Sequence, residues 1–145
     1  FVLLDYRGAD LLQSLQYGPN VIKPNFSEFV RTFLPQKSEA EVSEHTDDPS
    51  LISAVREEML RVNAEYGSDV VVTRGAFPTL YVEDQQVRER EVPAVELVNT
   101  IGSGDAFGAG YLYARFAGAS VGDAVRIAGE CASKNAARLK PGSIA

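Results

Sequence analysis

The stretch that decides the fold is "DVVVTRG", residues 69–75, a run of β-branched side chains that ends in a glycine. A short apolar run bounded by a turn residue predicts a strand that is buried on both faces of a sheet. Apolar side chains recur at helical spacing over the preceding residues 50–66, which predicts an amphipathic helix. A helix that leads into a fully buried strand is typical of α/β proteins.

The same alternation of strands and helices continues on both sides of this stretch. Toward the N-terminus, the sequence predicts strands at "FVLLD" (1–5) and "NVIKPN" (20–25), and helices over about 9–17 and 26–34. Toward the C-terminus, it predicts a hairpin that turns at Asp84-Gln85, a short strand "AVELVN" (94–99), and helices over 103–116 and 121–139. This order predicts the α/β class, with a mainly parallel, Rossmann-like sheet, helices on both faces and a small antiparallel hairpin.

The composition is that of an ordinary globular protein, with 145 residues, 45% hydrophobic and 23% charged. The net charge is −6 and the basic residues are scattered, which argues against nucleic acid or an anionic membrane as the main partner. Cys131 is the single cysteine, so no internal disulfide can form and a reducing, cytoplasmic compartment is expected. No signal peptide is visible, and no apolar run reaches the roughly 18 residues that a membrane span needs. Because the sequence opens directly on a strand pattern, we expect it to be a portion of a longer protein.

Residues 99–110, "NTIGSGDAFGAG", place three small residues, Gly102-Ser103-Gly104, before Asp105 at the start of a predicted helix. Unhindered N–H groups at the positive end of a helix dipole favour an anion. A carboxylate beside such a site suits phosphoryl transfer, in which Asp105 would take the proton of the attacking hydroxyl. The alternative is structural, with glycines that allow a tight turn and an aspartate that favours the helix dipole. The local pattern leaves both interpretations open.

Two other glycine motifs do not fit this segment. A Walker-type loop ends in Gly-Lys-Ser/Thr, and no lysine lies here. In a dinucleotide fingerprint the third glycine would come one place earlier than Gly108, and a strand rather than a second helix would follow the first helix.

Polar residues also follow two of the predicted strands, where ligands of α/β proteins bind. In "KPNFSE", Asn25 and Glu28 have the spacing of a helix capping box, and they could equally order water around Mg²⁺ and phosphates, with Lys23 adding a charge. In "VVVTRGAF", Thr73 and Gly75 could meet the phosphates or ribose of a nucleotide, or could simply form a turn.

Three other features have simpler interpretations. His45 has no second metal ligand at useful spacing, which indicates a surface histidine. The acidic residues of segment 36–49 indicate a solvated loop. Cys131 falls on the apolar side of the last predicted helix and is expected to pack there.

Taken together and in their order along the chain, the motifs resemble the ribokinase/PfkB family of sugar kinases. "NTIGSGDAFGAGYL" (99–112) is similar to the C-terminal signature of that family, and "NFSE" (25–28) to its Asn-x-x-Glu motif. "VVVTRGAF" (70–77) resembles its nucleotide-side strand and turn, and "KNAARLKPGSI" (134–144) its last helix and glycine turn. The resemblance spans nearly the whole chain.

The resemblance implies a ribokinase-like fold and ATP-dependent phosphorylation of a sugar or sugar-phosphate hydroxyl. It makes Asp105 the catalytic base, and the N–H groups of Gly102, Ser103 and Gly104 the anion hole for the transferred γ-phosphoryl.

Further site residues follow from the same resemblance. Asn25 and Glu28 would serve Mg²⁺ and the phosphates, with the metal held through water, and Thr73 and Gly75 would serve the nucleotide. The adenine is expected at the last helix, and the two residues assigned to it are Gly129 and Asn135.

Two departures from the family bear on cofactor and acceptor. Some members bind a monovalent cation beside the signature, with aspartate where this chain has Asn99, which leaves K⁺ open. The N-terminal half of the family, which carries most acceptor-sugar contacts and a small β-lid that often dimerises, has no counterpart in this sequence. We therefore expect residues 1–145 to be the C-terminal nucleotide-binding and catalytic portion, with little activity alone, of a protein whose intact form could be a homodimer.

Several alternatives stay open. "KPN" (23–25) is similar to the phosphosugar-kinase branch, such as 1-phosphofructokinase or tagatose-6-phosphate kinase, whereas "DYRGADLL" (5–12) resembles a fructokinase-like Asp-x-Arg. A nucleotide-binding or regulatory module of the same fold that phosphorylates nothing is the second hypothesis. A structural domain that binds no nucleotide is the third.

Overall fold

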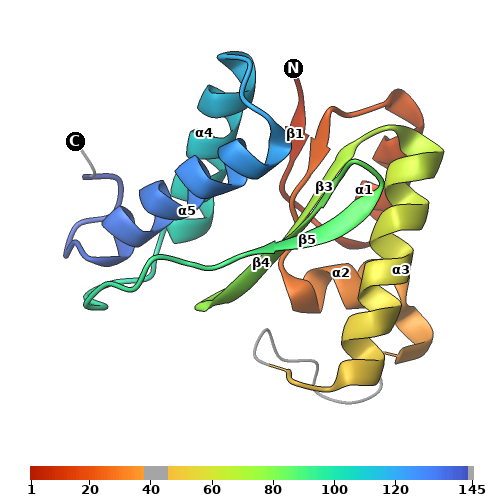
Figure 1. Ribbon diagram of the computed structural model, residues 1–145, viewed down its shortest axis with the longest axis horizontal. Coiled ribbons are helices and arrows are strands. Elements are labelled where there is room, and N and C mark those ends of the chain that lie inside the picture. Colours follow the sequence, from red (N-terminus) through yellow and green to blue (C-terminus); the bar gives the residue numbers. More distant parts are fainter. Residues whose placement is uncertain (38–45, 144–145) are drawn as a thin grey trace. The chain divides into compact units, whose positions relative to one another are not determined.

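The computed structural model describes residues 1–37 and 46–143 of the chain (Figure 1). The expectations for His45 and for most of the acidic loop therefore lie outside the described residues. The chain divides into two compact units, an N-terminal unit (Phe1–Glu89) and a C-terminal unit (Arg90–Ala145). Each is described by itself.

The N-terminal unit contains the sheet. Its strands are β1 (Leu3–Leu4), β2 (Val21–Ile22), β3 (Asp69–Arg74), β4 (Phe77–Glu83) and β5 (Gln86–Arg90), the last of which ends at the boundary between the units. Its helices are α1 (Gly8–Ser14), α2 (Phe26–Phe33) and α3 (Pro49–Tyr66), with short 3₁₀ turns η1 (Leu15–Tyr17) and η2 (Pro35–Lys37). These elements follow the predicted order, with β1 and β2 shorter than the apolar patterns that predicted them.

The sheet has the spatial order β1-β2-β3-β4-β5. Strands β1, β2 and β3 are parallel to one another, and β4 runs antiparallel to β3. The predicted hairpin is confirmed, because β4 and β5 are joined at Asp84 and Gln85, whose φ angles are 52° and 59°. Two successive residues with positive φ match the right-handed twist of the flanking strands.

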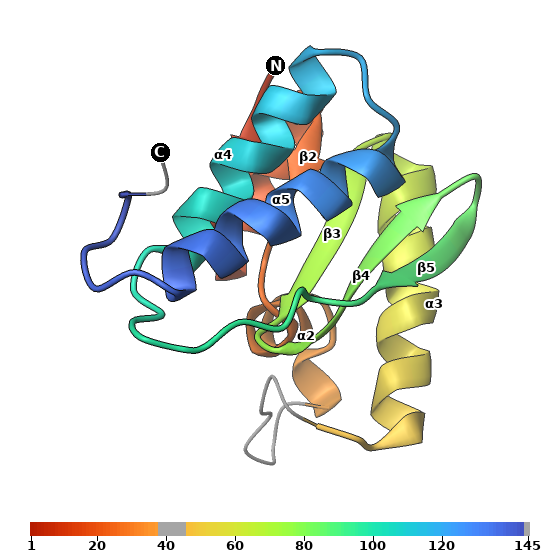
Figure 2. The same cartoon turned by 60° about the vertical axis from the view of Figure 1, so that its left-hand side comes forward.

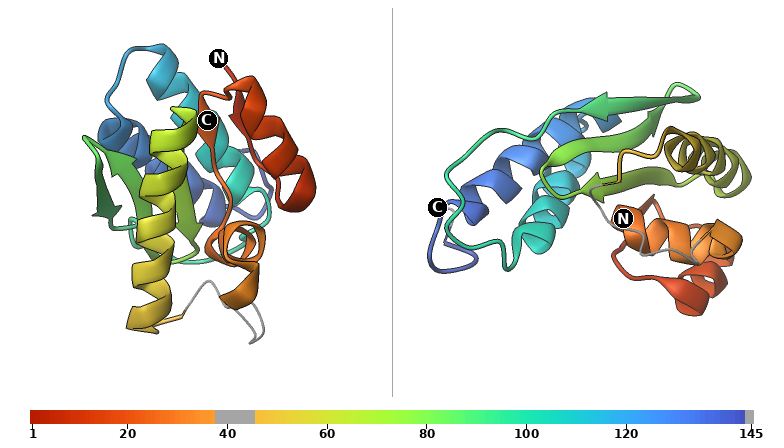
Figure 3. Two further views of the ribbon diagram at one scale, coloured as in Figure 1. Left: turned by 90° about the vertical axis from the view of Figure 1, so that its right-hand side faces the viewer. Right: turned by 90° about the horizontal axis from the view of Figure 1, so that it is seen from below.

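One face of the sheet carries the core of the N-terminal unit. Alternate strand residues, among them Ile22, Val70 and Val72, are buried against α1, α2 and α3. The three helices lie on the same side of the sheet (Figure 3). On α3, the buried side chains are Val55, Met59 and Val62, three of the positions whose spacing predicted that helix.

The C-terminal unit is built on a pair of helices, α4 (Ser103–Phe116) and α5 (Val121–Ala136), which lie side by side (Figure 2). Small residues allow this close approach. A Cβ added at Gly110 would lie 2.9 Å from the Cys131 Sγ and 3.1 Å from the Ala128 Cα. Cys131 thus packs against the glycine-rich face of α4, as the sequence predicted.

The strand expected at residues 94–99 does not form. Pro93 lacks an N–H group, and the N–H groups of Val98 and Asn99 both donate to the carbonyl oxygen of Ala136, at 2.9 and 3.0 Å. The apolar side chains of Leu97 and Val98 are exposed. The segment therefore caps the end of α5 instead of joining a sheet, and α5 ends at Ala136, earlier than the predicted residue 139.

Within the described part of the chain, no helix combines the length and the apolar character that crossing a membrane requires.

Candidate functional site

Two predicted site residues lie side by side where β2 and β3 end. Asn25 and Thr73 form a parallel bridge, and the Thr73 N–H donates to the carbonyl oxygen of Pro24 at 3.3 Å. Gly75 follows β3 with a φ of 59°, so the chain turns away immediately after Thr73. This is the carboxyl edge of the parallel strands, where α/β proteins bind ligands.

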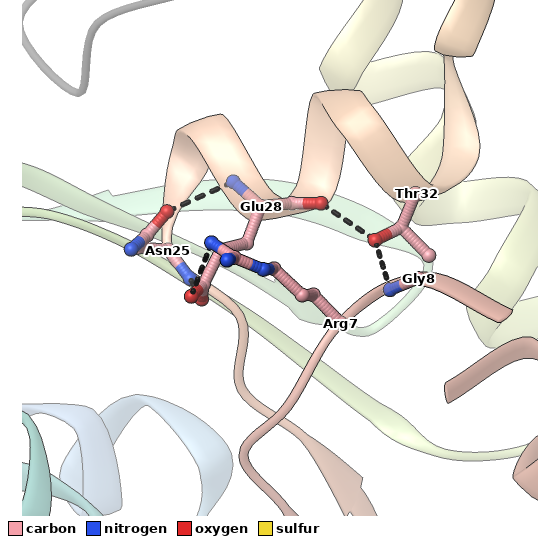
Figure 4. A network of polar contacts seen from close by, with 5 residues as sticks. All are labelled: Arg7, Gly8, Asn25, Glu28 and Thr32. Atoms are coloured by element: carbon pink, nitrogen blue, oxygen red, sulfur yellow. Dashed lines mark hydrogen bonds and ion pairs between the residues drawn. The ribbon is translucent and has the colours of Figure 1, made fainter. Parts of the chain in front are cut away.

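Asn25 and Glu28 form a complete capping box at the start of α2 (Figure 4). The Glu28 N–H donates to Asn25 Oδ1 at 2.9 Å, and the Asn25 N–H donates to Glu28 Oε2 at 3.0 Å. The structural interpretation of this motif is therefore confirmed. Glu28 Oε1 takes no part in the cap, so a role of this carboxylate toward a ligand is compatible with it.

Arg7 lies over this capping box (Figure 4). The sequence did not predict a role for Arg7 in the site. Its Nη1 is 3.6 Å from Glu28 Oε1, with 61% of the Arg7 side chain and 23% of the Glu28 side chain exposed. Thr32 fixes the same corner, because its hydroxyl donates to the Glu28 carbonyl oxygen at 2.7 Å and accepts from the Gly8 N–H at 2.9 Å. The feature of the sequence that indicates Arg7 is the Asp-x-Arg pattern. It follows the first strand, so it lies at the same edge of the sheet as "NFSE".

Two further cations at this edge are buried. Lys23 Nζ lies 2.9 Å from Asp5 Oδ2, so its charge is compensated within the protein. Arg74 is 5% exposed, and its guanidinium lies 5.3 Å from the ring centroids of both Phe26 and Phe77. Such packing over aromatic faces is favourable for a cation. Arg74 thus takes the buried position next to Thr73, and its only signal in the sequence is a charge at the end of an apolar strand.

In the C-terminal unit, the residues predicted to form an anion hole lie at the start of α4. Gly102 precedes the helix with a φ of 77°, a left-handed conformation that favours glycine. The Ser103 N–H donates to the Thr100 carbonyl oxygen at 3.1 Å, and the Ala106 N–H donates to the Gly102 carbonyl oxygen at 2.9 Å. The Ser103 N–H, which the sequence placed among the anion-hole donors, is thus used within the turn.

The donors at this helix start that remain for a ligand are the N–H groups of Gly104 and Asp105. Both residues are exposed, and no other described residue holds the Asp105 carboxylate by a hydrogen bond or an ion pair. A carboxylate beside open N–H groups at a helix N-terminus can accept a proton while the N–H groups bind an anion.

Asn135, which the sequence placed at the adenine, has different surroundings. It is fully buried, and its amide bonds to three groups of the same unit, Ile101, Ser103 and Gly142. Both N–H groups of the amide are used in these bonds, so in this conformation Asn135 supports the loop before α4 instead of facing a base. Gly129 is buried in α5, where an added Cβ would lie 3.7 Å from the Pro93 Cδ.

Asn99 also bonds within the protein. Its Nδ2 donates to the Leu139 carbonyl oxygen at 3.0 Å, and its Oδ1 accepts from the Ile101 N–H at 3.0 Å. A neutral amide that donates to a carbonyl does not fit a cation site that calls for a carboxylate. Among the described residues, no group of three or more His, Cys, Asp or Glu side chains could hold a metal ion.

The predicted site residues thus fall into two sets. The first, in the N-terminal unit, consists of Asn25, Glu28, Thr73 and Gly75. The second, in the C-terminal unit, consists of Gly102, Ser103, Gly104, Asp105 and Asn135. Each set is assembled within its own unit, and Gly129 lies apart from the second set on α5.

Comparison with known proteins identifies the family. The family model described as "pfkB family carbohydrate kinase" matches residues 1–144. The chain belongs to this family of carbohydrate kinases.

Two curated relatives and one solved structure illustrate the relationship. The D-tagatose-1-phosphate kinase of Bacillus licheniformis is 30% identical over 135 residues, which cover 93% of this chain and 41% of that protein. The 1-phosphofructokinase of Haloferax volcanii is 34% identical over 121 residues, which cover 83% of this chain and 35% of that protein. The chain therefore spans less than half the length of the curated relatives it matches.

The solved structure is that of a ribokinase from Thermotoga maritima. It superposes with a TM-score of 0.71 at 20% sequence identity, over 99% of this chain and 45% of that one. At this identity the likeness shows the fold alone, and that fold is the ribokinase-like α/β fold expected from the sequence.

Proposed function

We propose that this chain is the nucleotide-binding and catalytic portion of an ATP-dependent carbohydrate kinase. The complete enzyme would transfer the γ-phosphoryl group of ATP to a hydroxyl of a sugar or sugar phosphate. Sugar phosphates are included because the two curated relatives are named as kinases of such compounds. The observation that supports the proposal most is the start of α4, where an exposed carboxylate stands beside open N–H groups in a chain that belongs to the family.

In this proposal the α4 start supplies the chemistry. The Asp105 carboxylate takes the proton of the acceptor hydroxyl as that oxygen attacks the γ-phosphorus. The bond from the γ-phosphorus to the bridging oxygen breaks, and ADP leaves. The open N–H groups of Gly104 and Asp105, which follow Gly102 at the helix start, bind the charge that spreads over the transferred phosphoryl oxygens, and the helix dipole adds to their effect.

The carboxyl edge of the sheet would serve the nucleotide. Thr73 and Gly75 offer a hydroxyl and turning backbone to its phosphates or ribose, and Gly129 of α5 stays the candidate on the adenine side. Glu28 fits a role toward Mg²⁺ through water because the helix cap uses its Oε2 and not its Oε1. Asn25 Oδ1 accepts the Glu28 N–H in the cap and has a second lone pair that could accept from such a water. When bound, Mg²⁺ would neutralise phosphate charge.

The acceptor would be selected largely outside these residues. The matched relatives are more than twice as long as this chain, so we propose that the remaining part of the protein supplies the sugar contacts and any dimer interface. We further propose a cytoplasmic enzyme, in keeping with the single cysteine.

The test is Asp105→Asn in the complete enzyme. Loss of the base should lower kcat by about 10²–10⁴-fold, while calorimetric titration with ATP analogues still shows binding. Asp123→Asn, a change in the first turn of α5, is the matched control and should leave kcat unchanged. An Asp105→Asn enzyme with full kcat would remove this residue from the mechanism. ATP binding without phosphorylation of any sugar by the wild type would instead identify a non-catalytic nucleotide-binding module.

A further inference from the structure

Asn135 is a fully buried amide that ties three separate points of the C-terminal unit together. Its Nδ2 donates to the Ile101 carbonyl oxygen at 2.8 Å and to the Ser103 Oγ at 3.2 Å. Its Oδ1 accepts from the Gly142 N–H at 2.8 Å. The loop before α4 and the turn after α5 are thus held by one side chain, whose burial excludes water from competing for these bonds.

The partners of Asn135 determine which way its amide faces. A backbone carbonyl can only accept and a backbone N–H can only donate, so the nitrogen must face Ile101 and the oxygen must face Gly142. The second N–H of the amide then points at the hydroxyl of Ser103, which accepts it. Because that hydroxyl oxygen is occupied as an acceptor on one side, its own hydrogen is directed to another partner.

The backbone around this amide leaves little room for other arrangements. A Cβ added at Gly102 would lie 3.3 Å from the Pro141 Cβ and 3.8 Å from the Asn135 Nδ2. The turn that contains Pro141 and Gly142 therefore supports the glycine that opens α4. Since the Ser103 N–H already donates to Thr100, Ser103 can serve an anion through its hydroxyl rather than through its backbone.

We propose that Asn135 is a positioning residue of the kinase reaction, which holds the loop before α4 and orients the Ser103 hydroxyl as a donor to the transferred phosphoryl group. This inference rests on the proposed function and goes beyond it, because it replaces a role at the adenine with one at the reacting phosphate. It also makes the turn at Pro141-Gly142 part of the support of the anion hole.

The test compares Asn135→Leu with Ser133→Ala in the complete enzyme. Leucine has the branched shape of asparagine, although it is larger, and it has no hydrogen-bonding group. Ser133 is a buried residue of the same helix whose hydroxyl donates to the Pro93 carbonyl oxygen at 3.1 Å, so its loss removes a buried bond away from the α4 loop. We expect Asn135→Leu to lower kcat about 10–100-fold with little change in the KM for ATP, because displaced donors act mainly on the transition state. Ser133→Ala should lower Tm without lowering kcat.

Ser103→Ala keeps the amide and removes only the hydroxyl, so it tests the proposal even if Asn135→Leu does not fold. It should lower kcat by a similar factor, and the double variant should lose less than the product of the two single effects, because both act through one donor. A kcat of Ser103→Ala equal to that of the wild type would overturn the proposal. So would a kcat of Asn135→Leu no lower than that of Ser133→Ala.

Hydrogen exchange separates this inference from the proposed function, because it needs no kinase activity. The hydrogen-bonded amides of Ser103 and Ala106 should exchange faster in Asn135→Leu than in Ser133→Ala, and equal exchange would overturn the positioning role. A wild-type enzyme that phosphorylates no sugar overturns the proposed function, and with it the part of Ser103 in phosphoryl transfer.

Discussion

The replacement of Gly102 by alanine tests the geometry of the α4 start most directly. Gly102 has a φ of 77°, a region in which a Cβ collides with the following backbone. The added Cβ would also lie 3.3 Å from the Pro141 Cβ, closer than the usual separation of two carbon atoms of about 3.5–4.0 Å. The variant must therefore carry backbone strain and displace either the loop or the turn against which it packs.

The magnitude follows from these two terms. The left-handed conformation costs alanine about 1–2 kcal/mol, and the stiffer unfolded chain returns about 0.4–1 kcal/mol of this. We expect a net loss of about 1 kcal/mol in the free energy of unfolding, which lowers Tm by about 2–4 °C in a protein of more than 150 residues. The contact with Pro141 adds to this loss. Because the displaced segment carries the proposed anion hole, kcat should fall by about 10²-fold.

Gly118→Ala is the matched control. Gly118 follows the other end of α4 with a φ of 88°, and a Cβ added there meets no atom within 4 Å. By calorimetry, Gly118→Ala should lose stability from backbone strain alone, and Gly102→Ala should lose somewhat more because of its contact with Pro141. A coupled assay of sugar phosphorylation by the complete enzyme should show a lower kcat for Gly102→Ala only. A Gly102→Ala enzyme with wild-type kcat, or an equal loss of kcat in Gly118→Ala, would refute the reasoning.

Four further expectations follow from the same structure. Gln85→Gly should raise the free energy of unfolding by about 0.5–1 kcal/mol in thermal or urea unfolding, because φ is 59° there and glycine carries no strain at this angle. Gly110→Ala should destabilise the protein by about 1–2 kcal/mol, because its Cβ would lie 2.9 Å from the Cys131 Sγ. Adding Cys131→Ala should recover part of this loss, and an unchanged Tm in the single variant would contradict this packing. Glu28→Gln retains an oxygen for the helix cap but loses the charge, so the Mg²⁺ concentration that gives half of the maximal rate should rise several-fold. If this concentration does not change, Glu28 has no role toward the metal. Because the amide of Asn99 bonds within the protein, initial rates in potassium chloride and in tetramethylammonium chloride should agree within about twofold. A large activation by K⁺ would contradict the interpretation that Asn99 does not suit a cation site.

Local features could be predicted from the sequence with close boundaries. The helix expected over 103–116 is found as Ser103–Phe116, the capping box of Asn25 and Glu28 has both of its bonds, and the hairpin turns at Asp84 and Gln85. Each of these depends on residues within a few positions of one another, so propensity, spacing and turn chemistry are sufficient to specify them.

Predictions that depended on distant partners were less complete. The segment 94–99 has a strand-like pattern, yet its N–H groups donate to Ala136 at the end of α5. Phe77 is a local neighbour of Arg74 across the turn between β3 and β4, but nothing near Arg74 in the sequence indicates that its guanidinium also lies over the ring of Phe26 in α2. Ala136 and Phe26 both belong to elements whose positions only packing determines.

The sequence by itself determined the family, the order of elements and the place of Asp105 at a glycine-rich helix start. The tertiary structure decided what surrounds that helix start. Asn135 and Ile101 are 34 positions apart and meet only because α5 packs along α4 through residues as small as Gly110. Local hydrogen bonds can be predicted from the spacing of residues along the chain. The partners of a buried amide cannot, because they are distant backbone groups that close packing brings next to it and shields from water.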